Sequence, residues 1–238
     1  MDPIQQVRLA ADRTVAAGTA RLTMTAPAPA ASTTDIEGTV DFTNRRSWAR
    51  VAMPPMTDGG GTVAVEMIID GPHLYLEVIG HPGRFVRTRL DEHGDGMPAG
   101  DPGLLLDWLR GCTQAIPTSA TDPADDGQLT VLDVVLDLDR AVEAAPEDSR
   151  RAVRLWIDRM APDGRPRPAR VWLDTHNRVH RLIVREVGDE LDVRLTDHAE
   201  PIAIPLPDDN ALIDPTELQQ LLPDLPDLPD PPPDWNSR

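Results

Sequence analysis

The feature that most constrains the fold of this chain is an alternation of apolar and polar residues that recurs in one segment after another. It is clearest over 190 to 198, where Leu191, Val193 and Leu195 alternate with charged or polar neighbours. Similar segments, separated by short turns, occur at 19 to 26, 34 to 43, 47 to 53, 62 to 70, 73 to 79, 84 to 89, 168 to 175 and 178 to 187. Because successive strand residues point to opposite faces, the pattern predicts an antiparallel sheet with one buried and one solvated face.

Three segments with helical spacing interrupt this pattern. They are 3 to 17, a helix that starts at Asp101 and carries an apolar stripe of Leu105, Trp108, Leu109 and Cys112, and 147 to 160. Between the last two helices, residues 129 to 138 are apolar on both faces, which predicts a central strand. Strands and helices do not alternate one by one, so a parallel doubly wound sheet is not expected. The predicted fold is α+β: a strongly curved antiparallel sheet of about 10 to 11 strands with helices packed on one face.

Composition excludes several classes of function. The formal net charge of −17 would repel phosphate groups, and no arginine-rich face with interleaved aromatic residues occurs, so nucleic acid is not an expected partner. No run of about 18 or more apolar residues occurs, so no transmembrane segment is expected. All 23 basic residues are arginine, a bias typical of GC-rich genomes such as those of actinobacteria.

No arrangement of reactive side chains predicts an enzyme. Cys112 is the single cysteine, which excludes an intramolecular disulfide, and its apolar neighbours predict a buried small hydrophobic residue. His176 and His180 have a spacing that suits zinc only on a helix, whereas they lie across a predicted strand turn. The acidic loops at 91 to 95 and 122 to 127 are interpreted as solvated turns. Serine-hydrolase and phosphate-binding motifs are missing as well, so we expect no catalysis, no cofactor and no metal.

The end of the chain differs from the rest. We expect a single domain over 1–210, followed by an acidic, proline-rich tail over 211–238 in which Asp214 has the form of a helix cap. Prolines then recur at every third position, which is the period of a polyproline II helix. Two interpretations stay open, a largely disordered acidic spacer or a segment that docks into a groove on a partner protein. The apolar side chains available for docking are Leu225, Leu228 and Trp235.

Five short phrases stand out in the order 38–42, 70–76, 101–105, 135–141 and 168–182. The last contains Val171-Trp172-Leu173-Asp174 and, after a turn, Asn177-Arg178-Val179-His180-Arg181-Leu182. Each phrase alone is common, but their order and spacing together are specific. The set resembles phrases of the LppX/LprG-type, LolA-like lipoproteins of actinobacteria.

This resemblance implies an open half-barrel whose concave face is partly covered by helices, with a cavity for acyl chains or other apolar molecules between sheet and helices. It also implies a role in lipid or lipoprotein traffic and no catalytic residues. Members of the family are normally secreted and tethered through an N-terminal lipobox cysteine, whereas the segment after Met1 shows neither a signal peptide nor that cysteine. We therefore expect the cell envelope from the resemblance, and the cytoplasm if Met1 is the genuine start.

The side chains expected to line such a cavity lie on the two later helices. They are Leu104, Leu105, Trp108 and Leu109 on one helix and Val153, Trp156, Ile157 and Met160 on the other. Because a filled core and a lined pocket use the same apolar residues, the sequence leaves both open. The main functional hypothesis is a non-catalytic carrier of a lipid or other apolar ligand. The alternative is a structural or protein-interaction module that recruits a partner through the tail.

Overall fold

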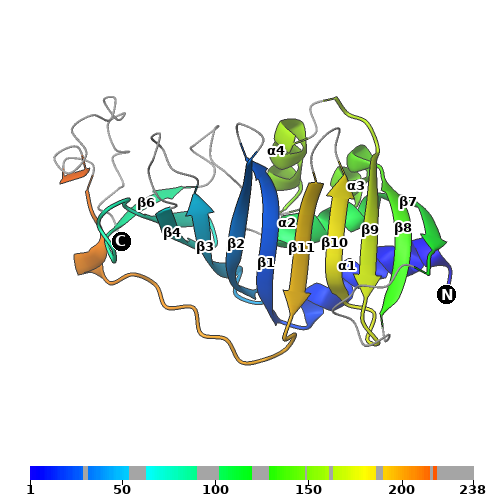
Figure 1. Cartoon of the computed structure of the whole chain (residues 1–238), viewed down its shortest axis with the longest axis horizontal. Helices are drawn as coiled ribbons and strands as arrows, with labels where there is room; N and C mark the ends of the chain where they lie inside the picture. The colour runs from blue at the N-terminus through cyan, green and yellow to red at the C-terminus, as the bar shows by residue number, and fades with distance from the viewer. Residues whose placement is uncertain are drawn as a thin grey trace.

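The described part of the chain forms one open antiparallel sheet of eleven strands in the order β6-β5-β4-β3-β2-β1-β11-β10-β9-β8-β7 (Figure 1). The computed structural model describes residues 1–28, 32–53, 63–89, 102–119, 129–147, 149–160, 163–185, 190–214 and 217–218. The strands are β1 (Thr19–Ala28), β2 (Ser32–Asp41), β3 (Arg46–Met53), β4 (Val63–Asp70), β5 (His73–Glu77), β6 (Phe85–Arg89), β7 (Cys112–Pro117), β8 (Thr130–Leu136), β9 (Arg167–Leu173), β10 (Val179–Arg185) and β11 (Glu190–Thr196). The predicted antiparallel sheet is confirmed.

The sheet consists of two meanders, because strands that follow one another in the chain also pair with one another. Strands β1 to β6 make one half and β7 to β11 the other, and β1 pairs with β11 to join them. The alternation in the sequence sets the faces: Leu191, Val193 and Leu195 of β11 point into the core and are at most 5% exposed. Strands β6 and β7 end the sheet without pairing with each other, so the sheet is open.

The described residues form four α-helices, which lie behind the sheet in Figure 1. They are α1 (Pro3–Ala16), α2 (Pro102–Trp108), α3 (Leu138–Ala144) and α4 (Arg150–Met160). The Asp2 side chain caps α1 by accepting a hydrogen bond from the Gln5 amide at 3.1 Å. The buried Thr14 hydroxyl of α1 accepts a hydrogen bond from the Val179 amide of β10 at 2.8 Å, which ties the helix to the sheet.

The connection after α2 differs from the prediction. Cys112 does not continue the apolar stripe of α2, because a 3-10 turn (Leu109–Gly111) ends the helix and Cys112 begins β7. The sequence pattern did not predict this strand. Gly111 lets this turn lie directly against the start of α3, since a Cβ at that position would be 2.1 Å from the Asp137 carbonyl oxygen.

The segment between β8 and α4 also differs. The predicted strand over 129–138 ends at Leu136, because Asp137 caps α3 by accepting a hydrogen bond from the Arg140 amide at 3.1 Å. The predicted helix over 147–160 begins only at Arg150, and α3 was not expected. Strand β8 has a neighbour on each side, as its two apolar faces require, but it lies next to the edge strand β7 rather than at the centre.

Residues 199–214, here called the strap, follow β11 and run across to the other half of the molecule (Figure 1). The alternation of Ile202 and Ile204 with their neighbours is typical of a short edge strand, but both residues pack against the outer face of the sheet without forming a strand. Prolines at positions 201, 205 and 207 explain the difference, because proline has no N–H to donate to a strand ladder.

The far end of the strap is anchored on the sheet. The Ile213 amide donates a hydrogen bond to the Phe85 carbonyl at 2.8 Å. Ile213 is 1% exposed and Leu218 is 8% exposed. The packed part of the chain therefore extends past residue 210, the domain boundary expected from the sequence, and residues 219–238 lie outside the described residues.

Candidate functional site

A cavity of about 190 Å³ lies between the helices and the inner face of the sheet. Its apolar walls come from α1, β2, the turn after β2, β4 and α2, through Val15, Val40, Phe42, Ile69 and Leu104 respectively. Polar and charged side chains complete the lining, namely Asp41, Arg45, Arg46, Ser47, Asp107, Arg110 and Ser149. The arrangement is an apolar space with a polar border, which is the usual character of a site for a small apolar ligand.

An ion-pair network holds the helical wall of this cavity in place. The Arg110 guanidinium pairs with Asp107 at 2.8 Å and with Asp12 of α1 at 2.7 Å. The Ser149 hydroxyl donates a hydrogen bond to the buried Asp107 carboxylate at 3.2 Å. Burial alone would lower the pKa of Arg110, but the two carboxylates outweigh it and raise that pKa above its ordinary value. Arg110 therefore stays charged and links α1, α2 and the residue before α4.

The eight side chains predicted to line a ligand cavity fall into three groups. Leu104 lines the cavity. Five others belong to the main hydrophobic core and are at most 4% exposed: Leu105, Trp108, Leu109, Val153 and Ile157. The side chains of Trp156 and Met160 lie outside the described residues. The structure thus brings six of the eight into one buried region, and contact of any of them with a ligand stays a prediction.

The sheet side of the cavity was not among the predicted site residues. Val40 and Ile69 are inward-facing positions of β2 and β4, and Val15 ends the apolar stripe of α1. The alternation that predicted the inner face of the strands also marks Val40 and Ile69 as inward-facing. The alternation does not predict which of the inward-facing residues lie next to the start of α2. That depends on how helix and sheet pack, although they are far apart in the sequence.

A groove of about 320 Å³ lies on the outer face of the sheet. Charged side chains of both signs line it, among them Asp35, Glu37, Arg50, Asp192 and Arg194. Charged side chains also border the inner cavity, but its apolar walls are more extensive than those of the groove, where the apolar side chains are Met24, Ile36, Ala52 and Ala64. The inner cavity is therefore the better candidate for an apolar ligand.

The described residues offer little reactive chemistry. Within them, no group of three His, Cys, Asp or Glu side chains is placed to hold a metal ion. Cys112 is buried, as predicted, and burial raises the pKa of its thiol to about 11, so the thiol is protonated near neutral pH. The loops at 91 to 95 and 122 to 127 lie outside the described residues. Among the helices described, none is long and apolar enough to cross a membrane.

Comparison with known proteins identifies the fold. No protein-family model matches the chain, and no curated protein matches it in sequence. Among solved structures, LprF from Mycobacterium bovis is similar with a TM-score of 0.56 and 17% identity, covering 87% of this chain and 97% of LprF. The lipoprotein LppX from Mycobacterium tuberculosis is similar with a TM-score of 0.53 and 14% identity, covering 86% of this chain and 100% of LppX. The chain therefore has the fold of the LppX/LprG-type lipoproteins, as the phrases in its sequence predicted.

Proposed function

We propose that this protein is a non-catalytic carrier that binds an apolar ligand, such as the acyl chain of a lipid, between its curved sheet and its helices. The observation that carries the proposal is the apolar cavity between β2, β4 and α2 in a fold shared with the lipoprotein LppX. By the same likeness, we propose that it works in the cell envelope.

The size and lining of the cavity suggest how a ligand would sit. Sites for drug-sized molecules usually measure about 300–1,000 Å³, so a cavity of about 190 Å³ suits one apolar segment of a larger molecule. The remainder would extend past the border formed by Asp41, Arg45 and Arg46. Charged residues at the border suit the polar end of an amphipathic ligand, because that end can keep its hydrogen bonds there.

The charged groups near the cavity are engaged in holding the structure together. Arg46 pairs with Asp70 at 2.6 Å, and Arg110 pairs with Asp107 and Asp12. Removing one partner from a part-buried pair leaves the other charge uncompensated, which favours keeping these pairs intact. This supports binding rather than chemistry as the task of the site.

The proposal is tested by native mass spectrometry of the protein after expression in a bacterium, followed by organic extraction and lipid analysis. We expect a co-purifying apolar molecule, and we expect Val15→Trp to reduce its occupancy by about fivefold or more, because Val15 lies on the cavity wall and is 37% exposed. Leu155→Trp is the matched control, since Leu155 is exposed on α4. Empty spectra from the wild-type protein, or equal loss in both variants, would contradict the proposal.

A further inference from the structure

A second cavity, of about 420 Å³, lies on the outer face of the sheet beneath the strap. Its floor is formed by Trp48 of β3, Ile68 of β4 and Phe85 of β6, and its cover by Ile202 and Leu206 of the strap. Its volume lies within the range of about 300–1,000 Å³ that is usual for ligand sites. It is separate from the inner cavity, because outward-facing side chains form its floor.

The strap covers this cavity without a hydrogen-bond ladder. At its start, the Thr19 hydroxyl donates a hydrogen bond to the Glu200 carbonyl at 2.6 Å, and at its end Ile213 is bonded to Phe85. In the described part of the chain, no backbone hydrogen bond joins residues 201–207 to the sheet. The middle of the strap is therefore held by apolar side chains, and it can move outward without breaking hydrogen bonds.

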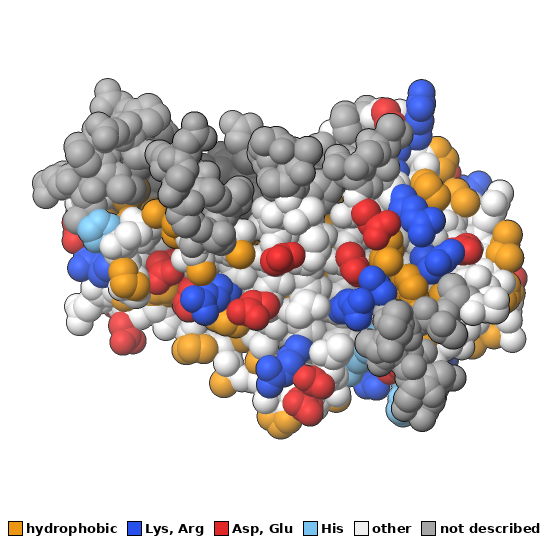
Figure 2. Space-filling model, in the orientation of Figure 1, with side chains coloured by type: hydrophobic (Ala, Val, Ile, Leu, Met, Phe, Trp, Pro, Cys, Tyr) orange, Lys and Arg blue, Asp and Glu red, His pale blue; other side chains and the backbone are white. Residues whose placement is uncertain are grey.

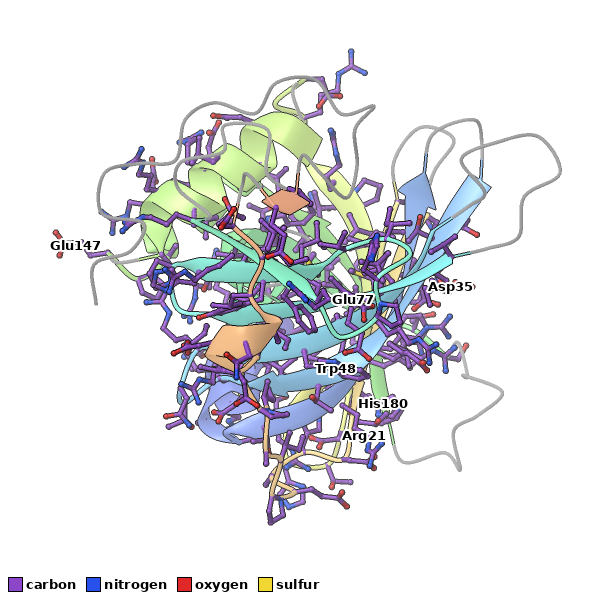
Figure 3. The ribbon with its side chains drawn as sticks, turned by 90° about the vertical axis from the view of Figure 1, so that its left-hand side faces the viewer. Arg21, Asp35, Trp48, Glu77, Glu147 and His180 are labelled. Atoms are coloured by element: carbon purple, nitrogen blue, oxygen red, sulfur yellow. The ribbon has the colours of Figure 1, made fainter. Side chains whose placement is uncertain are left out.

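The charge in this cavity has one sign. Glu66 supplies the only charged side chain among the described residues that line it, and its carboxylate accepts a hydrogen bond from the Trp48 indole N–H at 3.4 Å. Glu77 lies beside it, because its carboxylate accepts a hydrogen bond from the Glu66 amide at 3.2 Å. Figure 3 labels Trp48 and Glu77 in the view that faces this half of the molecule.

Arginine side chains flank this acidic group without lining the cavity, and one of them is Arg87 of β6, which is opposite Tyr75 on the outer face. Arg50 is directly opposite Glu66 in the pairing of β3 with β4, but it is exposed and lines the separate polar groove. On its other side Arg50 is opposite Glu37 of β2. The row Glu37, Arg50, Glu66 and Glu77 therefore carries three carboxylates and one guanidinium.

We infer that this outer cavity binds an apolar cation, meaning a molecule with an apolar or aromatic body and a single ammonium group. The apolar body of the ligand would fill the space between Trp48, Phe85 and Leu206, and its ammonium group would lie near Glu66. Aromatic faces attract ammonium groups, and a carboxylate adds a charge-assisted partner. An anion of the same shape would meet Glu66 and be repelled.

The test uses 2-phenylethylammonium as the cation and 3-phenylpropionate as an anion with a similar ring and chain. Binding is followed by NMR through the indole N–H signal of Trp48, which Trp48→Phe assigns by its disappearance. We expect a saturable shift with the cation only. Glu66→Gln, which keeps the shape and removes the charge, should weaken cation binding by about tenfold.

Glu37→Gln is the matched control, because it removes a carboxylate from the same row without touching the cavity lining. It should leave binding within about twofold of the wild type. Val15→Trp should also bind the cation normally, so a failure of the inner site and a failure of this one can be told apart. Equal binding of cation and anion, no saturable shift with the cation, or unchanged cation binding in Glu66→Gln, would overturn the inference.

Discussion

The two halves of the sheet cover their outward-facing apolar residues in different ways. On β8, β9 and β10, Val131, Trp172 and Ile183 form an outward cluster, and the side chains of Arg170 and Arg181 lie over its Trp172 ring. The Arg181 guanidinium carbon lies 4.9 Å from the centre of the Trp172 ring, and Arg181 is held there by Asp192 at 2.6 Å. Figure 2 shows this mixture of basic and acidic side chains over the outer face.

On the half made by β3 to β6, a segment of chain covers the outward residues instead. Ile68, Tyr75 and Phe85 pack against Ile204 and its neighbours in the strap. Arginine side chains that stack on a ring leave little space, whereas an extended segment that rests on side chains leaves a cavity of about 420 Å³. Apolar residues on the outer face of a strand must be shielded from water, either by side chains or by another segment of chain. The type of shielding decides whether space for a ligand is left above them.

The largest effect is expected where the strap is anchored. Ile213→Ala should lower the free energy of unfolding by about 2–5 kcal/mol, because it leaves a void at a buried position. Leu109→Ala, at a buried position in the other half, should lower the free energy of unfolding by a similar amount if the strap is as integral to the fold as the helices are. The measurement is urea unfolding, with the slope m compared between variants.

Ile116→Ala serves as the control for this pair, because Ile116 is 64% exposed. Its effect should stay within about 0.5 kcal/mol. A loss for Ile213→Ala no larger than for Ile116→Ala would show that the strap is not integral to the fold.

The next effect is expected at two glycines, one in each half. A Cβ at Gly38 would lie 2.1 Å from the Trp48 carbonyl oxygen, and one at Gly111 would lie equally close to that of Asp137. Because backbone atoms must shift in both cases, each Gly→Ala change should cost about 1–3 kcal/mol in the free energy of unfolding. Gly71→Ala, at φ +55° but with open space around it, should cost less, about 1 kcal/mol. Equal losses of stability at all three positions would contradict the conclusion that close packing requires glycine at positions 38 and 111.

A smaller effect is expected from the arginine cover. Arg181→Ala should destabilise the protein by about 1 kcal/mol, since it removes a part-buried ion pair and exposes the Trp172 ring. Arg185→Ala removes an exposed pair with Glu190 at 3.5 Å and should change the stability little. The measurement is the thermal unfolding midpoint of each variant, and equal decreases in the two variants would argue against a covering role for Arg181.

The smallest effect is a pH dependence near the start of the strap. Burial, assisted by the charge of Arg178, lowers the pKa of His198 below its ordinary value of 6.5. The unfolded chain therefore binds a proton more readily, so the contribution of His198 is constant above about pH 6.5 and stability falls as the pH drops below that value. In His198→Gln, the loss of stability between pH 7 and pH 5 should be smaller than in the wild type. An identical pH dependence in both proteins would contradict this assignment.

The sequence predicted the strands of the sheet well, because alternation reports directly on which face a residue occupies. It failed at β7, because Cys112 keeps the helical spacing of Leu105, Trp108 and Leu109 in the sequence although the helix has ended and Cys112 begins a strand. It also failed at the strap, where the alternation at Ile202 and Ile204 reports contact with the outer face and the prolines prevent strand pairing. Alternation gives the face of a residue but not its partner.

The candidate site was predicted only in part for the same reason. Leu104, one of the predicted site residues, lines the inner cavity, whereas Val40 and Ile69 on the opposite wall were not among the predicted residues. The choice between filling a core and lining a cavity depends on gaps between packed elements, and such gaps have no signature in composition or period. The outer cavity was not predicted either, because Trp48 and Glu66 become neighbours of the strap only in three dimensions.

Ligand binding in the inner cavity is tested most directly by mapping where an apolar ligand lies on the protein. A fatty acid that carries a diazirine in its chain is bound, activated by light and located by mass spectrometry of the digested protein. We predict crosslinks to the walls of the inner cavity, at Val40–Ser47 and Gly103–Arg110. Crosslinks confined to residues 201–207 and the outer face, or spread evenly over the surface, would contradict the account.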